Sequence, residues 1–158
     1  MTSPDRETLG RLADRQSIED VLVEYCYRCD LNDPDGLAML FTEDCEADYG
    51  PGVGPPSVGR AARRDEAARD LALFESTSHH LSNVIVEFEG ENRARARSVI
   101  HAWHRTRAEG PDWNLRAQYH DALVRTADGW KIAARRLVVV DAENFPEEWG
   151  FHRLERNP

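Results

Sequence analysis

Lysine is almost absent from this sequence. Lys131 stands alone among 20 basic residues, and the others are all arginines. Imine-forming catalysis needs a lysine amine, so it would depend on this one residue and is not expected. The 29 acidic residues set the net charge at −9, which disfavours binding to nucleic acid or to an anionic membrane. We therefore expect neither of these partners.

Long apolar runs are missing as well. No stretch approaches the roughly 18–20 apolar residues of a membrane-spanning helix, and the N-terminal segment lacks the apolar core of a signal peptide. Cysteine is scarce, with three residues in the chain. We expect these thiols to be reduced in the cytoplasm, and the length fits one domain over residues 1–158.

Several motifs for cofactors and metals are incomplete. The Gly- and Pro-rich segment 50–59 lacks the Gly-Lys-Ser/Thr ending of a phosphate loop, and no Gly-x-Ser-x-Gly occurs. Cys26 and Cys29 lie in a predicted helix without a second cysteine pair, which favours core packing. His101 and His104 lie on a predicted strand, where an odd offset points them to opposite faces. The sequence therefore predicts no metal and no cofactor.

Hydrophobic periodicity changes from helical to alternating near the middle of the chain. The predicted helices cover residues 5–31, 34–41 and 60–75, and the predicted strands cover 45–49, 84–88, 93–107, 115–126 and 130–140. Helices followed by a meander predict an α+β fold, in which a curved antiparallel or mixed sheet wraps around the N-terminal helices. Such a sheet encloses one hydrophobic pocket. We expect a core over about 12–140 and a tail, 141–158, that serves as a pocket lid or a subunit contact.

The starts of the first two helices are marked by specific residues. The first has an apolar stripe that includes Leu9 and Leu12, although Gly10 weakens this part and Asp14 is suited to cap a second segment. Asp33 is the predicted N-cap of the second helix, because a proline follows it at the first helical position.

Asp30 and the pair His79-His80 are candidates for acid–base chemistry. Asp30 lies near the C-terminal end of its helix, where the helix dipole disfavours a carboxylate, unless it simply begins the polar loop that follows. Neighbouring strand residues face opposite ways, so at most one of His79 and His80 enters the interior. A histidine beside a buried carboxylate is a natural general base, although a histidine at the start of a strand is also common in a structural role.

Further candidates share an inward position and a polar or small side chain. Two tyrosines can donate phenolic hydrogen bonds, and alternation places small residues on one face of strand 93–107. These pocket candidates are Tyr25, Tyr49, Ile100, Ala102, His104, Tyr119 and one of Arg135 and Arg136.

The chain resembles the SnoaL-like proteins of the nuclear transport factor 2-like superfamily, which are cone-shaped α+β folds. The matching segments are IEDVLVEYCYRCD at 18–30, LFTED at 40–44, SHHLSN at 78–83, YHD at 119–121 and DGWKI at 128–132, followed by Arg135-Arg136. They cover about 12–140 and are most similar to the branch with scytalone dehydratase, bile-acid 7α-dehydratase and hexachlorocyclohexane dehydrochlorinase. These enzymes are cofactor-free lyases built on an Asp–His pair.

The resemblance assigns roles to individual residues. Asp30 matches the family aspartate and His79, not His80, matches the histidine. Tyr25 corresponds to the catalytic tyrosine of the bile-acid enzyme, and Tyr49 to the carbonyl-polarising tyrosine of scytalone dehydratase.

Other positions match less regularly. His104 falls at a second pocket histidine and Arg135 at the dehydrochlorinase arginine, although a slip of one residue would select Arg136. Cys29 replaces a tyrosine of scytalone dehydratase, and Ala102 lies near a second aspartate of the bile-acid enzyme.

The resemblance implies a lyase that eliminates water from an apolar cyclic or polycyclic substrate. His79 would remove a proton α to a carbonyl, the tyrosines would bind the enolate oxygen, and His104 or a tyrosine would protonate the departing hydroxyl. An isomerase or polyketide cyclase with the same pocket is an alternative, as is a non-catalytic ligand-binding subunit or small subunit of a ring-hydroxylating dioxygenase. A homodimer or homotrimer is expected, with Val99 and Trp103 at the contact.

Overall fold

The computed structural model describes residues 3–156, so the first two and last two positions of the predicted 1–158 domain lie outside the described residues. Within these described residues, three helices and six strands follow one another. They are α1 (Ser3–Asp30), α2 (Pro34–Ala38), β1 (Phe41–Asp48), β2 (Ser57–Val58), α3 (Arg60–Leu71), β3 (Phe74–Phe88), β4 (Arg93–Thr106), β5 (Trp113–Thr126) and β6 (Gly129–Glu143).

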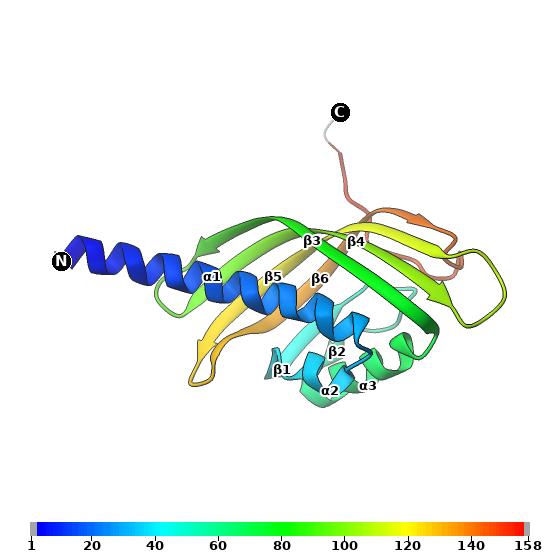
Figure 1. The fold of residues 1–158 in the computed structure, drawn as a ribbon, viewed down its shortest axis with the longest axis horizontal. Coiled ribbons are helices and arrows are strands. Elements are labelled where there is room, and N and C mark those ends of the chain that lie inside the picture. Colours follow the sequence, from blue (N-terminus) through cyan, green and yellow to red (C-terminus); the bar gives the residue numbers. More distant parts are fainter. Residues whose placement is uncertain (1–2, 157–158) are drawn as a thin grey trace.

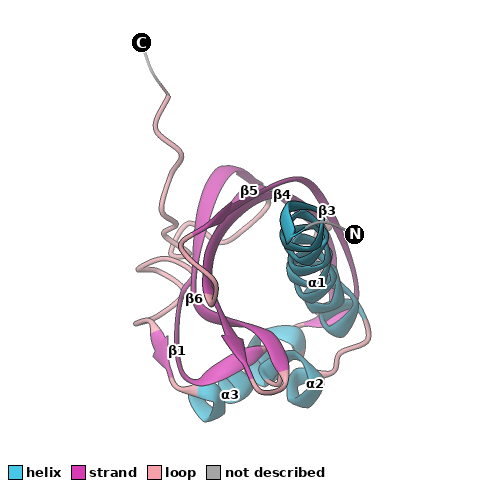
Figure 2. Ribbon diagram, turned by 90° about the vertical axis from the view of Figure 1, so that its left-hand side faces the viewer, coloured by secondary structure: helices cyan, strands magenta, loops and turns pink. Residues whose placement is uncertain are grey.

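All six strands form one sheet in the order β2-β1-β6-β5-β4-β3. The pairs are antiparallel except for β1 and β6, which run parallel. The sheet curves around α1, while α2 and α3 lie at its lower side, as Figure 2 shows. The predicted α+β class with a curved mixed sheet around the N-terminal helix is confirmed.

Helix α1 is continuous through Gly10 and Asp14, so the second segment suggested by Asp14 is not a separate helix. Asp14 instead pairs with Arg125 and accepts a hydrogen bond from Trp130. The first turns of α1 extend beyond the end of the sheet (Figure 1). For this reason Leu9 and Leu12, predicted on the apolar stripe, are 52% and 59% exposed.

Helix α2 begins as predicted. Asp33 is its N-cap, because the Gly36 amide donates to Asp33 Oδ1 over 2.8 Å. The helix ends earlier than predicted, at Ala38, because Phe41 already begins β1 beside Ile132 of β6.

Strand β3 is ten residues longer than the predicted strand 84–88. It begins at Phe74, pairs with β4 along its whole length, and takes over the end of the predicted helix 60–75. A register shift lies between Ser82 and Ile85, and Asn83 there has φ 51°. This β-bulge changes which residues of β3 face inward.

The alternation predicted for β4 is confirmed. Ala94, Ala96, Ser98, Ile100, Ala102 and His104 are all buried. The two arginines of β6 also separate, since Arg135 is 2% exposed and Arg136 lies on the solvent side. The inward residues of the sheet pack with α1 into one core cluster.

The tail returns over the end of the sheet after β6. The Val139 amide donates to His152 O at 2.7 Å, and the Gly52 amide donates to Gly150 O at 2.9 Å. His152 Nε2 also donates to Asp48 at 2.8 Å. Within residues 3–156, no helix is both long and apolar enough to cross a membrane.

Candidate active site

Asp30 and His79 form a close pair at the end of α1. His79 Nδ1 lies 2.7 Å from Asp30 Oδ1, and the His79 backbone amide donates to Asp30 Oδ2 at 3.0 Å. Thr77 Oγ1 donates a further hydrogen bond to Asp30 Oδ1 at 2.9 Å. The two residues are 49 positions apart in sequence and meet because the last turn of α1 packs on β3.

The hydrogen bonds determine which histidine nitrogen is available. Burial raises the pKa of Asp30, but the hydrogen bonds from His79 and Thr77 outweigh this and lower that pKa below its usual value. The carboxylate is therefore charged at neutral pH and accepts the Nδ1 proton of His79. Its Nε2 atom has no hydrogen-bond partner among the described residues and is free to accept a proton.

His104 lies next to this pair. Its ring meets that of His79 edge to face, with centroids 5.3 Å apart. Burial and the neighbouring His79 lower the pKa of His104 to about 3, although the Trp113 backbone opposes the shift. His104 is therefore neutral at physiological pH. A neutral His104 is better suited to a hydrogen bond in the cavity than to protonating a departing hydroxyl group.

Tyr25 and Tyr49 face each other with their hydroxyl oxygens 2.8 Å apart. Burial raises the pKa of both phenols, so both keep their protons at neutral pH. One hydroxyl donates to the other, which leaves one proton of the pair for a ligand oxygen. The guanidinium of Arg63 lies over the Tyr49 ring, 4.8 Å from its centroid.

One cavity of about 100 Å³ connects these groups. Its lining includes five of the predicted residues, His79, His104, Tyr25, Tyr49 and Tyr119. It also includes three aromatic residues of the tail, Phe145, Trp149 and Phe151.

Four predicted site residues lie outside the lining of this cavity. Asp30 is one of them, and its link to the cavity is the contact with His79. Ile100 and Ala102 are buried on the same face of β4 but pack in the core. Arg135 also faces inward, but its Nε and Nη2 atoms donate to Asp121 at 2.7 and 2.9 Å. Its guanidinium lies 4.1 Å from the Tyr25 ring centroid and 3.9 Å from that of Tyr119. Arg135 therefore packs against the rings of two cavity tyrosines without lining the cavity itself.

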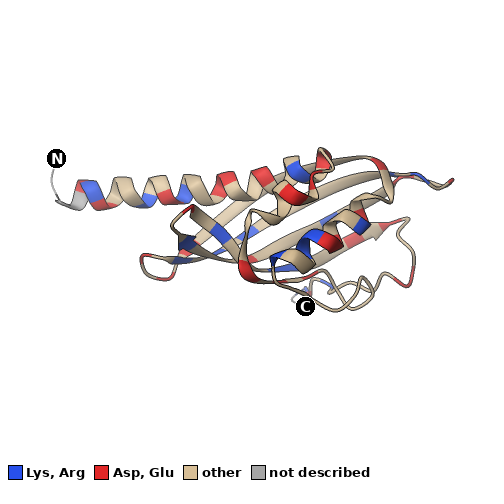
Figure 3. Ribbon diagram, turned by 90° about the horizontal axis from the view of Figure 1, so that it is seen from below, with Lys and Arg blue, Asp and Glu red and all other residues tan. Residues whose placement is uncertain are grey.

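Sequence reasoning missed the charged residues of α3. Arg63 and Glu66 are buried and form an ion pair, and Asp70 lines the cavity one turn later. Figure 3 shows acidic and basic residues mixed along this helix. The three positions lie on the same helical face as the buried residues Ala67 and Leu71, at a spacing of three and four residues. This spacing is the sequence signal for an inward position, but it is normally applied to apolar residues only.

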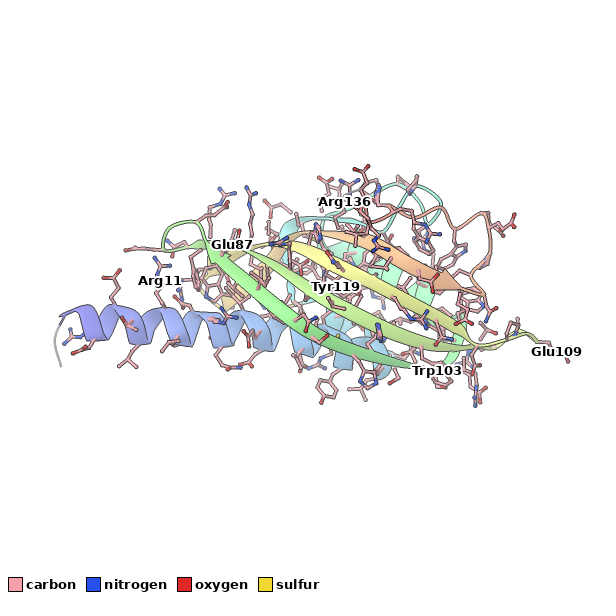
Figure 4. All side chains as sticks on the ribbon, turned by 90° about the horizontal axis from the view of Figure 1, so that it is seen from above. Arg11, Glu87, Trp103, Glu109, Tyr119 and Arg136 are labelled. Carbon is pink, nitrogen blue, oxygen red and sulfur yellow. The ribbon has the colours of Figure 1, made fainter. Side chains whose placement is uncertain are left out.

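A larger hollow, of about 520 Å³, lies on the other face of the sheet. Its lining includes outward charged residues such as Glu87 and Arg136, which Figure 4 labels, but neither Asp30 nor His79, whereas His79 lines the smaller cavity. We therefore place the site in the smaller cavity. Nowhere in residues 3–156 do three or more His, Cys, Asp or Glu side chains form a group that could hold a metal ion.

Fold and site together define a small α+β domain whose curved sheet and helices hold an Asp–His pair, of which His79 lines a cavity. The SnoaL-like domain model matches residues 10–136. The chain therefore belongs to the SnoaL-like domain family, and the resemblance inferred from its motifs is confirmed. No curated protein sequence matches it.

Solved structures show the same architecture. A Novosphingobium aromaticivorans protein described as a "Putative Scytalone Dehydratase" is 34% identical with a TM-score of 0.89, covering 96% of this chain and 99% of that one. Hexachlorocyclohexane dehydrochlorinase LinA-type3 of Novosphingobium barchaimii LL02 is 17% identical with a TM-score of 0.78, covering 94% and 99%. At the latter identity the likeness concerns the fold alone.

Proposed function

We propose that this protein is a cofactor-free lyase that eliminates water from a β-hydroxy carbonyl compound with an apolar ring. The observation that supports this most directly is the 2.7 Å contact between Asp30 Oδ1 and His79 Nδ1, which leaves Nε2 available for a substrate proton. The 34% identical relative described as a "Putative Scytalone Dehydratase" supports the same class of reaction.

In the proposed reaction, His79 Nε2 removes the proton α to the carbonyl. Asp30 then stabilises the imidazolium that forms, because a negative charge lies beside its Nδ1–H. The free proton of the Tyr25–Tyr49 pair donates to the carbonyl oxygen, on which the enolate charge develops. Collapse of the enolate expels the β-hydroxyl and forms the carbon–carbon double bond.

The cavity favours a small, apolar substrate. With the tail in place its volume is about 100 Å³, which is below the roughly 150 Å³ of a cavity that holds benzene. We therefore propose a single-ring substrate, which needs a small shift of the tail aromatics, whereas a polycyclic one needs a larger movement. Aromatic rings make up much of the lining, which suits an apolar ring better than a sugar.

The test uses 3-hydroxycyclohexanone in D₂O. Mass spectrometry follows loss of water, and NMR follows exchange of the protons α to the carbonyl. We expect the wild type to catalyse both, and His79→Gln to lower both by about 10²–10⁴-fold, as for loss of a general base. His80→Gln is the matched control, because His80 is exposed and its Nε2 contacts Ser78 rather than Asp30.

The same experiment separates the alternatives. Exchange without loss of water contradicts a dehydratase and supports an isomerase or cyclase with the same base. Binding of the ketone without exchange, unchanged in His79→Gln, contradicts enzymatic function and supports a ligand-binding subunit.

A further inference from the structure

Helix α3 directs charged side chains toward the cavity. Arg63 and Glu66 lie on its buried face and are only 3% and 6% exposed. They form an ion pair with each other through Arg63 Nη1, while the buried Arg63 Nε atom makes no hydrogen bond. Asp70 lies one turn further along the same face and lines the cavity.

Asp70 has no counter-ion of its own. Among the described residues, its carboxyl group makes no hydrogen bond and no ion pair, since the nearby cation Arg63 is engaged by Glu66. The titratable or charged groups around it are Arg63, Glu66 and Arg69 on α3 itself, Tyr25 and Cys29 from α1, Tyr49 after β1, Tyr119 from β5, and His79 and His104 from β3 and β4.

These surroundings favour the protonated acid. Burial, and then the charge of Glu66, raise the pKa of Asp70 to about 6, although Arg63 and Arg69 oppose the shift. With a pKa of about 6, roughly half of Asp70 carries a proton at pH 6 and about a tenth at pH 7. A carboxylic acid with a pKa near the working pH both donates and regains a proton readily.

Asp70 and His79 line the same small cavity. The cavity has a volume of about 100 Å³, so it has room for no more than one small ligand between α3 and β3. The base that removes the proton and the unpartnered acid therefore meet the same ligand.

We propose that Asp70 is the general acid that protonates the departing hydroxyl group. The inference rests on the proposed dehydration. His79 takes the Cα proton, and the electron pair of that C–H bond becomes the enolate. As the new Cα–Cβ double bond forms, the Cβ–O bond breaks and the oxygen takes the Asp70 proton. Water leaves, Asp70 is a carboxylate and His79 an imidazolium, and transfer of one proton from His79 to Asp70 restores the starting state.

The other polar groups of the cavity are poorer acids for this step. His104 is neutral, as shown above, and burial keeps the pKa of the cavity tyrosines above that of a free phenol. Each of these groups is suited to donating a hydrogen bond rather than transferring its proton.

The test separates the two proton transfers. Asp70→Asn keeps the shape of the side chain but has no acidic proton. We expect it to lower loss of water from 3-hydroxycyclohexanone by about 10²-fold or more. Exchange of the α protons in D₂O should stay close to the wild-type rate, because His79 performs that step. With 3-acetoxycyclohexanone, whose acetate leaves without protonation, elimination by the variant should recover to near the wild-type rate.

Asp65→Asn is the matched control, because it removes an exposed carboxylate from the same helix. We expect it to change neither rate. Unchanged loss of water in Asp70→Asn, or an equal fall of water loss, exchange and acetate elimination, overturns the role of Asp70. If the wild type shows no exchange at all, the proposed function itself fails and the role of Asp70 with it. Exchange that persists in Asp70→Asn also shows that the variant is folded.

Discussion

His79 and His104 meet edge to face at a centroid distance of 5.3 Å, yet only His79 has a carboxylate partner. Asp30 holds the Nδ1 proton of His79, while the Nδ1 atom of His104 is buried without a hydrogen bond of normal geometry. Two adjacent imidazoles therefore have different chemistry. His79 can be protonated in the cycle because Asp30 balances the charge, whereas His104 stays neutral.

His104→Gln should weaken the pH dependence of stability. Burial, followed by the nearby His79, lowers the pKa of His104 to about 3, whereas an unfolded histidine titrates near 6.5. The unfolded chain thus binds this proton first as the pH falls, so His104 costs about 2 kcal/mol of stability between pH 7 and pH 5. In urea unfolding, the free energy of unfolding should fall less between pH 7 and pH 5 in the variant than in the wild type, by about this amount.

Other titrating groups contribute equally to the pH dependence of stability in both proteins, so they cancel when the two are compared. Asp70 acts with the opposite sign, because its raised pKa makes the folded state bind the proton first, but this effect is present in both proteins. An equal pH dependence in wild type and His104→Gln would contradict the neutral, buried state of His104.

Thr77→Val should impair the Asp–His pair without removing it. The Thr77 hydroxyl donates to Asp30 Oδ1, and valine keeps its shape but lacks the donor. A hydrogen bond to a charged group is worth about 1.5–3 kcal/mol, and its low end predicts an exchange rate about 10-fold slower in D₂O. The pKa of Asp30 should also rise toward its ordinary value, since one of the hydrogen bonds that lower it is lost.

Ser78→Ala is the control for this change. Its hydroxyl is the neighbouring one on β3, but it contacts His80 Nε2 and not the Asp30–His79 pair. A similar loss of exchange in both variants would indicate a general effect on the strand rather than on the carboxylate.

Local sequence patterns correctly predicted those parts of the fold whose structure follows them. The inward residues of β4 and the Asp33 cap each depend on local patterns that the tertiary structure does not override. Strand β3 is different, because the bulge near Asn83 reverses its alternation. Counting back from Val84 would place His80 inward, whereas the structure turns His79 toward Asp30. The choice of His79 therefore depended on the family resemblance.

The rest of the site lies outside what periodicity can show. Asp70 follows the helical stripe, but a charged residue on a buried face violates the usual pattern of an amphipathic helix. The partner of Arg135 is Asp121 on the next strand, a contact that depends on the β5–β6 register rather than on local sequence. Such departures from local patterns are expected at functional sites.

Arg135→Met should destabilise the protein strongly. Its side chain and that of Asp121 are both fully buried, and loss of one partner leaves an uncompensated charge. Such a loss typically costs about 3–5 kcal/mol, while replacing both partners with apolar residues is often neutral. In urea unfolding, Arg135→Met should lose stability of this order, and the double variant Arg135→Met/Asp121→Leu should recover most of it.

Arg116 and Asp141 offer a matched surface pair between the same two strands. Their side chains are 46% and 56% exposed, so Arg116→Met should cost at most about 1 kcal/mol. Equal losses at the two arginines would contradict the expectation that burial makes the Arg135–Asp121 pair costly to break.

Gly52→Ala should release the tail from the cavity. A Cβ atom at Gly52 would lie 1.9 Å from the Gly150 nitrogen and 2.2 Å from the Glu148 oxygen, and both are backbone atoms that cannot rotate away. The strand-like contact of Val139 with His152 and Leu154 should then open, so that trypsin cleaves after Arg153 several times faster. Because Trp149 and Phe151 line the cavity, 3-hydroxycyclohexanone should also bind more weakly.

Gly10→Ala is the control for this change, because a Cβ atom there meets nothing within 4 Å. It should leave cleavage unchanged and stabilise α1 by up to about 1 kcal/mol. Wild-type cleavage and binding in Gly52→Ala would show that the tail does not close the cavity.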